Sequence, residues 1–241
     1  MERSEVGLEY LPQPDYLEFT LPNTHVALVT NDGSDLTSKV IAQLETKGNK
    51  VVALNLPNQA SKISTNGIDL ESHSDEAVKN AIEKIRTQYG EVGSFIHLHP
   101  HFEFQNGNFV QHFPAERQVV KTLFFLAKHL QKPLNDLGQT QRANFLSITR
   151  MDGKLGQGKR GNVSVVGGGI TGLVKCLSLE WSPVFCRAVD IQPELSSDVI
   201  ATQVIAELHD PNVRNMEVAF SEEGRATTSV TKVQLTENQS I

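Results

Sequence analysis

The chain has 241 residues, 39% of them hydrophobic, which is enough for one large α/β domain with a sizeable core. Its formal net charge is −6 and its lysines are scattered, so no basic stripe exists and nucleic acid is excluded as a partner. No apolar run approaches the roughly 20 residues of a membrane span. The polar N-terminus (MERSE) is no signal peptide, so we expect a cytoplasmic protein without a membrane partner.

Strand and helix patterns alternate along almost the whole chain. Residues 1–22, which hold three prolines, are predicted as an extended arm, and residues 23–241 as a single Rossmann-like domain. Short β-branched and apolar runs predict strands at residues 26–30, 50–56, 68–70, 94–98, 143–149, 186–191, 216–220 and 226–235. Apolar residues at helical spacing predict helices at residues 36–47, 75–89, 116–130, 170–181 and 198–208. This order predicts a doubly wound, mostly parallel α/β sheet with helices on both faces.

The turn after residues 26–30 lies where such a sheet binds a dinucleotide. A nucleotide turn needs several glycines, so that the backbone and the helix N-terminus can approach the pyrophosphate. Here Gly33 is the one glycine, and Asp32 and Asp35 place negative charge where a phosphate would lie. We interpret Asp35 as the N-cap of the next helix. The sequence therefore predicts no cofactor-binding residues in this chain.

The order of elements is similar to that of short-chain dehydrogenases/reductases. Their chemistry uses a Ser on the fifth strand and, about a dozen residues later, a Tyr whose pKa is lowered by a Lys. Ser147 stands at the expected place, but residues 162–164 (NVS) stand where the Tyr belongs, and the chain's tyrosines all lie earlier, at Tyr10, Tyr16 and Tyr89. The nearby lysines, without a tyrosine to act on, are Lys154, Lys159 and Lys175. We therefore interpret Ser147 as a polar strand end and predict no catalytic residue.

Two further features lie near the expected carboxyl edge of the sheet. The glycines at residues 167–169 are expected to precede a helix, either cradling an anion or allowing close packing on the sheet, and we favour packing. The charged residues Arg150, Asp152 and Lys154 follow the fifth predicted strand, residues 143–149. We interpret this segment either as a contact for a partner domain or carrier, or as a solvated loop.

The histidines and cysteines are the remaining candidates. His97, His99 and His101 alternate, so on a strand they would share one face, as in a zinc or copper site. Pro100 interrupts the pattern and no further ligand stands at a firm spacing, so we predict no metal. We expect His97 to be a core or interface group and the other two histidines to line the loop. The two cysteines are expected to be buried, reduced thiols, with a disulfide as the alternative; they are Cys176 and Cys186.

Three segments, in their order along the chain, resemble the ketoreductase region of modular polyketide synthases and, more closely, of polyketide-type polyunsaturated fatty acid synthases. They are residues 93–98 (GSFIHL), 172–183 (GLVKCLSLEWSP) and 187–191 (RAVDI). In these ketoreductases a truncated, non-catalytic structural half accompanies a catalytic half, and it typically closes with a Val-Ala-x-x-x-x-Gly-Arg strand pair. Residues 218–225 (VAFSEEGR) fit that ending. The chain departs in its fuller set of strands and helices and in Trp181-Ser182, where a His is more familiar.

The resemblance implies a structural subdomain that braces a separate catalytic half. That half would bind NADPH and reduce a β-ketoacyl chain on a carrier protein, so we expect no cofactor and no catalysis on this chain alone. The expected partners are the catalytic half and acyl-carrier domains. Two alternatives remain: a diverged free-standing short-chain reductase for a ketoacyl substrate, and a non-catalytic scaffold that dimerises through the helix at residues 116–130.

Overall fold

A computed structural model describes residues 3–14, 19–59, 61–100, 102, 113–158 and 164–233. In these residues one nine-stranded sheet has the order β1-β9-β8-β7-β6-β5-β2-β3-β4. Its strands are β1 (Arg3–Leu11), β2 (Val26–Asn31), β3 (Lys50–Asn55), β4 (Gly67–Asp69), β5 (Val92–Leu98), β6 (Ala143–Thr149), β7 (Val184–Ile191), β8 (Glu217–Ser221) and β9 (Gly224–Val233). The helices are α1 (Asp35–Thr46), α2 (Asp75–Tyr89), α3 (Phe113–Gly138), α4 (Val166–Glu180) and α5 (Ser197–Leu208).

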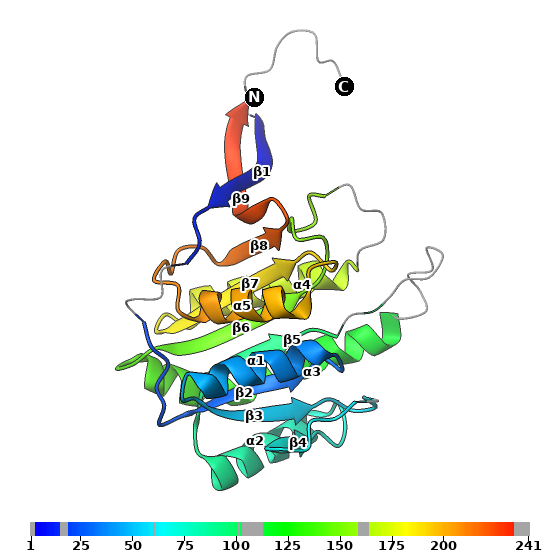
Figure 1. Ribbon diagram of the computed structural model, residues 1–241, viewed down its shortest axis with the longest axis vertical. Coiled ribbons are helices and arrows are strands. Elements are labelled where there is room, and N and C mark those ends of the chain that lie inside the picture. Colours follow the sequence, from blue (N-terminus) through cyan, green and yellow to red (C-terminus); the bar gives the residue numbers. More distant parts are fainter. Residues whose placement is uncertain are drawn as a thin grey trace.

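The sheet is parallel from β4 to β8 and antiparallel only at β9 and β1. Helices α1 and α5 pack over one face, and α2, α3 and α4 over the other (Figure 1). The central strands β2, β5, β6 and β7 are buried along their whole length, which explains their near-continuous apolar runs. The predicted doubly wound, mostly parallel α/β fold is confirmed.

Helix α3 is longer than its periodicity suggested, because it continues from residue 130 to Gly138 through Pro133. Leu134 and Leu137 keep the helical spacing after residue 130, and both are buried against the core. Burial of these side chains therefore extends the helix through a residue that would ordinarily end it.

The cap of α1 also differs from the prediction. Ser34, not Asp35, is the N-cap: it has an extended backbone, and its Oγ accepts a hydrogen bond from the Leu36 amide at 3.2 Å. Asp35 lies in the first helical turn, where its exposed carboxylate pairs with Lys39 at 3.1 Å. The assignment of Asp35 as the cap was wrong by one residue, because Ser34 already supplies the acceptor.

The glycine run lies inside a helix, since α4 begins at Val166. A Cβ atom at Gly167 would lie 2.4 Å from Sδ of Met151, whereas Gly168 and Gly169 have no such neighbour within 4 Å. The expected position before the helix was wrong. Close packing holds at Gly167, but its neighbour is Met151 in the segment after β6, not a strand of the sheet.

Much of the N-terminal arm belongs to the sheet, because β1 pairs with β9 along its whole length. The two strands form a ribbon that projects beyond the helix layers (Figure 1). Val6 and Val230 face each other across this ribbon, and they are 63% and 69% exposed. In the described parts of the chain, no helix has the length and apolar character needed to cross a membrane.

Candidate functional site

The strand order reverses between β2 and β5, and open α/β sheets bind ligands in the crevice at such a switch point. Helix α1 begins shortly after β2, so its N-terminus lies at the carboxyl end of β2, beside this switch point (Figure 1). The residues weighed in the sequence as candidates for catalysis, cofactor binding or metal binding come mainly from the turn after β2 and from the carboxyl ends of β5 and β6. The fold therefore brings these segments together at one edge of the sheet.

A carboxylate of the protein itself occupies the α1 N-terminus. The side chain of Asp32 is fully buried, and its Oδ1 accepts hydrogen bonds from the Ser34 amide at 3.0 Å and the Thr37 hydroxyl at 2.7 Å. Its Oδ2 accepts from the Ser34 hydroxyl at 2.7 Å and from Nη2 of Arg150 at 2.6 Å. Four donors thus surround one carboxylate at the positive end of the helix dipole.

The Asp32–Arg150 ion pair also crosses the crevice. Arg150 follows the last residue of β6, Asp32 follows the last residue of β2, and β5 lies between these two strands. A pyrophosphate at the α1 N-terminus would meet the negative charge of Asp32, which already occupies the donors of Ser34, Thr37 and Arg150. These residues do not fit the phosphates of a dinucleotide.

The residue at the end of β3 that would contact a ribose is Asn55, and its side chain is already hydrogen-bonded within the protein. Dinucleotide-binding folds place an acidic residue there, about 20 residues after the glycine turn. In this chain Asn55 occupies that place, and its Oδ1 accepts from Nδ2 of Asn31 at 2.9 Å and the Ile63 amide at 3.0 Å. Its Nδ2 donates to the Ile63 carbonyl at 3.0 Å and to Asp69 at 2.8 Å. The Asn55 amide is therefore engaged within the protein.

Ser147 lies in the middle of the sheet with no exposed surface. It is paired in register with His97 on β5, and its Oγ has no hydrogen-bond partner among the residues that the structure describes. Ser164, two residues before α4 begins its first turn, has a partner: its Oγ accepts a hydrogen bond from the Val166 amide at 3.1 Å. The predicted positions Lys159, Asn162 and Val163 lie outside the described residues, as does Tyr16. Tyr10 lies on the β1–β9 ribbon, hydrogen-bonded to Glu223.

His97 in β5 and His99, just after its end, belong to a buried hydrogen-bonded line. Thr30 Oγ1 lies 3.0 Å from Nδ1 of His97, whose Nε2 lies 3.3 Å from Nδ1 of His99. His99 in turn reaches Oε1 of Glu116 at 3.3 Å. Burial, reinforced by His99, holds the pKa of His97 well below its usual value.

His97 is a core residue as predicted. His99 is also buried, and it contacts both Glu116 of α3 and the ring of Phe102 in the loop after β5, with ring centroids 5.8 Å apart. The third histidine of the pattern, His101, lies outside the described residues. Across the described part of the chain, no group of three or more metal-ligating side chains comes together. The signal for the His99–Glu116 contact was absent from the sequence, because the two residues come from separate elements.

The segment after β6 wraps around two carboxylates. Asp190, in β7, accepts hydrogen bonds from the amides of Met151 at 2.8 Å and Leu155 at 3.0 Å. Asp152 accepts from the amides of Lys154 and Gly156 at 2.8 and 3.0 Å. Burial and the adjacent Asp152 raise the pKa of Asp190 to about 7. Burial also opposes ionisation of Asp152, but hydrogen bonds from Asp190 and the loop amides outweigh it and lower the pKa of Asp152.

Two of the three charges of this segment, those of Arg150 and Asp152, are turned inward, whereas Lys154 forms its ion pair at the surface. Asp152 is 5% exposed, Arg150 pairs with Asp32, and Lys154 pairs with Glu223 at 2.5 Å. The interpretation as a solvated loop was wrong for Asp152, because its carboxylate organises the loop backbone. A contact with a partner domain or carrier stays a prediction.

Two arginines of the ketoreductase-like motifs enter one buried ion cluster. Arg187 and Arg225 both contact Glu207 and Asp210, with Nε of Arg225 lying 2.6 Å from Oε1 of Glu207. All four side chains are at most 4% exposed. The cluster joins β7, the end of α5 and β9. Sequence reasoning missed it, although an arginine within the apolar strand at residues 184–191 was a signal.

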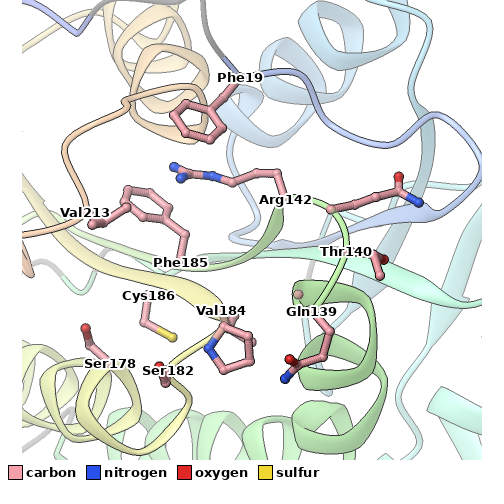
Figure 2. Close-up of a pocket in the computed structure, with 13 residues that line it drawn as sticks. Phe19, Gln139, Thr140, Arg142, Ser178, Ser182, Val184, Phe185, Cys186 and Val213 are labelled. Atoms are coloured by element: carbon pink, nitrogen blue, oxygen red, sulfur yellow. The ribbon is translucent and has the colours of Figure 1, made fainter.

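A pocket of about 540 Å³ lies at the opposite, amino edge of the sheet (Figure 2). In it the guanidinium of Arg142 lies between the rings of Phe19 and Phe185, at 4.7 and 3.6 Å from their centroids. Burial lowers the pKa of Arg142 to about 10. Cys186 lines the pocket as a free thiol, and burial raises its pKa to about 12, so it is a poor nucleophile. The other cysteine, Cys176, is also free but exposed, which corrects the expectation that both are buried.

Comparison with known proteins agrees with the fold and the motifs. The order of elements is that of the short-chain dehydrogenase/reductase fold. A 3-ketoacyl-(acyl-carrier-protein) reductase from Brucella melitensis, complexed with NADH, superimposes with a TM-score of 0.62 at 20% identity, covering 78% of this chain and 92% of that one. The adenylation, ketoreductase and pseudo-Asub structure of a keto acid-selecting NRPS module gives 0.70 at 13% identity, covering 95% of this chain and 18% of that one.

No protein-family model matches the chain. Its sequence is similar to a polyunsaturated fatty acid synthase subunit from Thraustochytrium sp. (strain ATCC 26185 / S-3), with 25% identity over 232 residues. The match covers 92% of this chain and 8% of that protein, so the chain spans a small part of the curated relative. The resemblance to a ketoreductase-like region of such a synthase is thereby confirmed.

Proposed function

We propose that this chain is the structural half of a β-ketoacyl reductase region in a multidomain polyunsaturated fatty acid or polyketide synthase. It would brace a catalytic half that binds NADPH and reduces a β-ketoacyl chain held on a carrier. The observation that carries the proposal is the crevice itself: the Asp32–Arg150 ion pair crosses the place where this fold binds a dinucleotide. We therefore infer that this chain binds no NADPH.

The motif residues support a structural role. Arg187 and Arg225 neutralise buried carboxylates and join β7 to β9. Asp190 holds the backbone after β6, and Trp181 packs edge-on against Phe145 with ring centroids 5.6 Å apart. Each of these side chains stabilises the packing of the sheet, which is what a bracing subdomain requires.

The partners follow from the proposal and from the relative's printed name. They are the catalytic ketoreductase half and the acyl-carrier domains of the same synthase, in the cytoplasm. The β1–β9 ribbon, with Val6 and Val230 exposed, supplies apolar surface for contact with another domain.

A diverged reductase is the second candidate. The observation that favours it is the polar line at the carboxyl half of the sheet, where buried Ser147 lies in register with His97. In that case His99 and Glu116 would have to replace the missing phenol as proton donor. Calorimetric titration separates the two candidates, since micromolar binding of NADPH by this chain would favour the reductase.

The bracing role is tested by reconstitution. The regions that flank the matched segment in the Thraustochytrium protein are expressed without that segment and mixed with this chain. We expect a complex on size-exclusion chromatography, and NADPH oxidation with a β-ketoacyl thioester in the mixture but not with this chain alone. The matched control is the Thraustochytrium protein's own segment, supplied in place of this chain. Absence of a complex where that control forms one, or turnover by this chain alone, would contradict the proposal.

A further inference from the structure

The fold is one that binds dinucleotides at the α1 N-terminus, yet the residues there do not fit one. We propose that Asp32 is an internal counter-ion that saturates an anion-binding site at this helix terminus, and that removal of its carboxylate opens the site to a small free oxyanion. The inference concerns the same crevice as the proposed function but does not depend on the bracing role.

The donors around Asp32 form a complete anion-binding set. The Ser34 amide and hydroxyl, the Thr37 hydroxyl and the Arg150 guanidinium lie within 2.6–3.0 Å of its two oxygens. Thr37 is fully buried, and the side chain of Arg150 is 13% exposed. Without an anion these groups would be desolvated donors and a nearly buried cation with no counter-charge, which is costly.

The neighbouring Asp35 shows that an acidic residue near a helix terminus does not by itself occupy the donors of an anion-binding site. Its side chain is 64% exposed and contacts Lys39 and Ser197 at the surface. The side chain of Asp32, in contrast, is fully buried and reaches across β5 to Arg150. Asp35 is therefore a matched control: an acid three positions away along the chain that does not contact the donor set.

Replacement of Asp32 by glycine removes the carboxylate and leaves its donors in place. Formate has the charge and shape of the group removed, and inorganic pyrophosphate represents the ligand class that this fold ordinarily takes at the helix terminus. Both anions should therefore stabilise Asp32→Gly by binding to the folded state. Neither should stabilise the wild-type chain, because Asp32 already occupies the donors.

The experiment measures thermal unfolding of the full chain in sodium formate, sodium pyrophosphate and sodium chloride at equal ionic strength. We expect Asp32→Gly to have a lower Tm than the wild type and to regain about 3–6 °C at ten times the dissociation constant of the anion. Asp32→Gly/Arg150→Met should lose most of that gain. Asp35→Gly should respond no more than the wild type. An equal anion response in the wild type, or a folded Asp32→Gly with no response, would overturn the proposal.

A double-mutant cycle covers the case in which Asp32→Gly does not fold in any of these salts. Asp32→Asn keeps the size of the side chain but removes its charge, and Arg150→Met removes the cation. We expect each single variant to lower Tm and the double variant to be more stable than the sum of the single losses predicts, because it buries no unpaired charge. Additive losses would overturn the proposal. Failure of either experiment leaves the bracing role standing, whereas NADPH binding by the wild type would refute that role.

Discussion

The buried ion cluster of Arg187, Arg225, Glu207 and Asp210 makes the sharpest prediction for stability. It contains two positive and two negative charges, and each carboxylate contacts both arginines. Replacement of Glu207 by Gln keeps the shape of the side chain but leaves the cluster with one uncompensated positive charge. Desolvated charges without a partner are costly, so the change should strongly destabilise the fold.

The expected magnitude follows from burial. Glu207 and Arg187 have no exposed side-chain surface and Arg225 has 3%, so solvent cannot compensate the lost charge. Breaking a buried ion pair by removing one partner costs about 3–5 kcal/mol. For a domain of this size each kcal/mol lowers Tm by about 2–4 °C, so Glu207→Gln should lower Tm by about 6–20 °C.

The assay is urea unfolding followed by circular dichroism, together with thermal unfolding. The urea midpoint should fall while the slope of the unfolding free energy against urea concentration stays unchanged. The slope depends on the surface exposed on unfolding, which is the same for the wild type and Glu207→Gln. Asp35→Asn is the control, because its exposed ion pair with Lys39 should contribute less than about 0.5 kcal/mol. A loss below about 1 kcal/mol for Glu207→Gln would refute the reasoning from burial.

Three further predictions concern groups buried elsewhere in the fold. Because burial and a neighbouring carboxylate raise the pKa of Asp190 from 3.8 to about 7, the folded chain retains a proton that the unfolded chain releases, so this group's contribution to stability should fall between about pH 4 and pH 7. Urea unfolding at several pH values tests this, and Asp190→Asn should flatten the profile; an unchanged profile would contradict the raised pKa. Gly167→Ala should cost about 1–3 kcal/mol because its Cβ would lie 2.4 Å from Sδ of Met151, whereas Gly168→Ala, with open space, should be neutral or stabilising. Ser147→Ala should lower the unfolding free energy by less than about 1 kcal/mol, because Oγ of Ser147 has no hydrogen-bond partner among the described residues. A larger loss in urea unfolding would show that this hydroxyl does have a partner.

The alternation of apolar runs and amphipathic helices predicted the elements well. The buried strands β2, β5, β6 and β7 were readable because a parallel sheet covered on both faces selects continuous apolar segments. Boundaries were less certain where packing competed with local signals. Leu137 extends α3 past Pro133 because burial of its side chain outweighs the local preference to end the helix.

The ketoreductase-like motifs were recognised from the sequence, but the physical roles of their residues were not. The order of residues 187–191 and 218–225 indicated a ketoreductase-like region, and the similarity to the fatty acid synthase from Thraustochytrium bears this out. Nothing in either segment showed that Arg187 and Arg225 would meet the same two carboxylates. That contact requires β7, α5 and β9 to be folded together, since its members are up to 38 positions apart in the chain.

The amino-acid sequence by itself determined the class of fold, the single glycine in the turn after β2 and the lack of a tyrosine after Ser147, because periodicity and residue type are local properties. Only the tertiary structure decided what Asp32 does. Its partner Arg150 lies 118 positions later in the chain and reaches it across β5. A negative charge near a helix terminus is readable from sequence, but whether that charge is solvated or saturated by buried donors depends on which distant strand ends beside it.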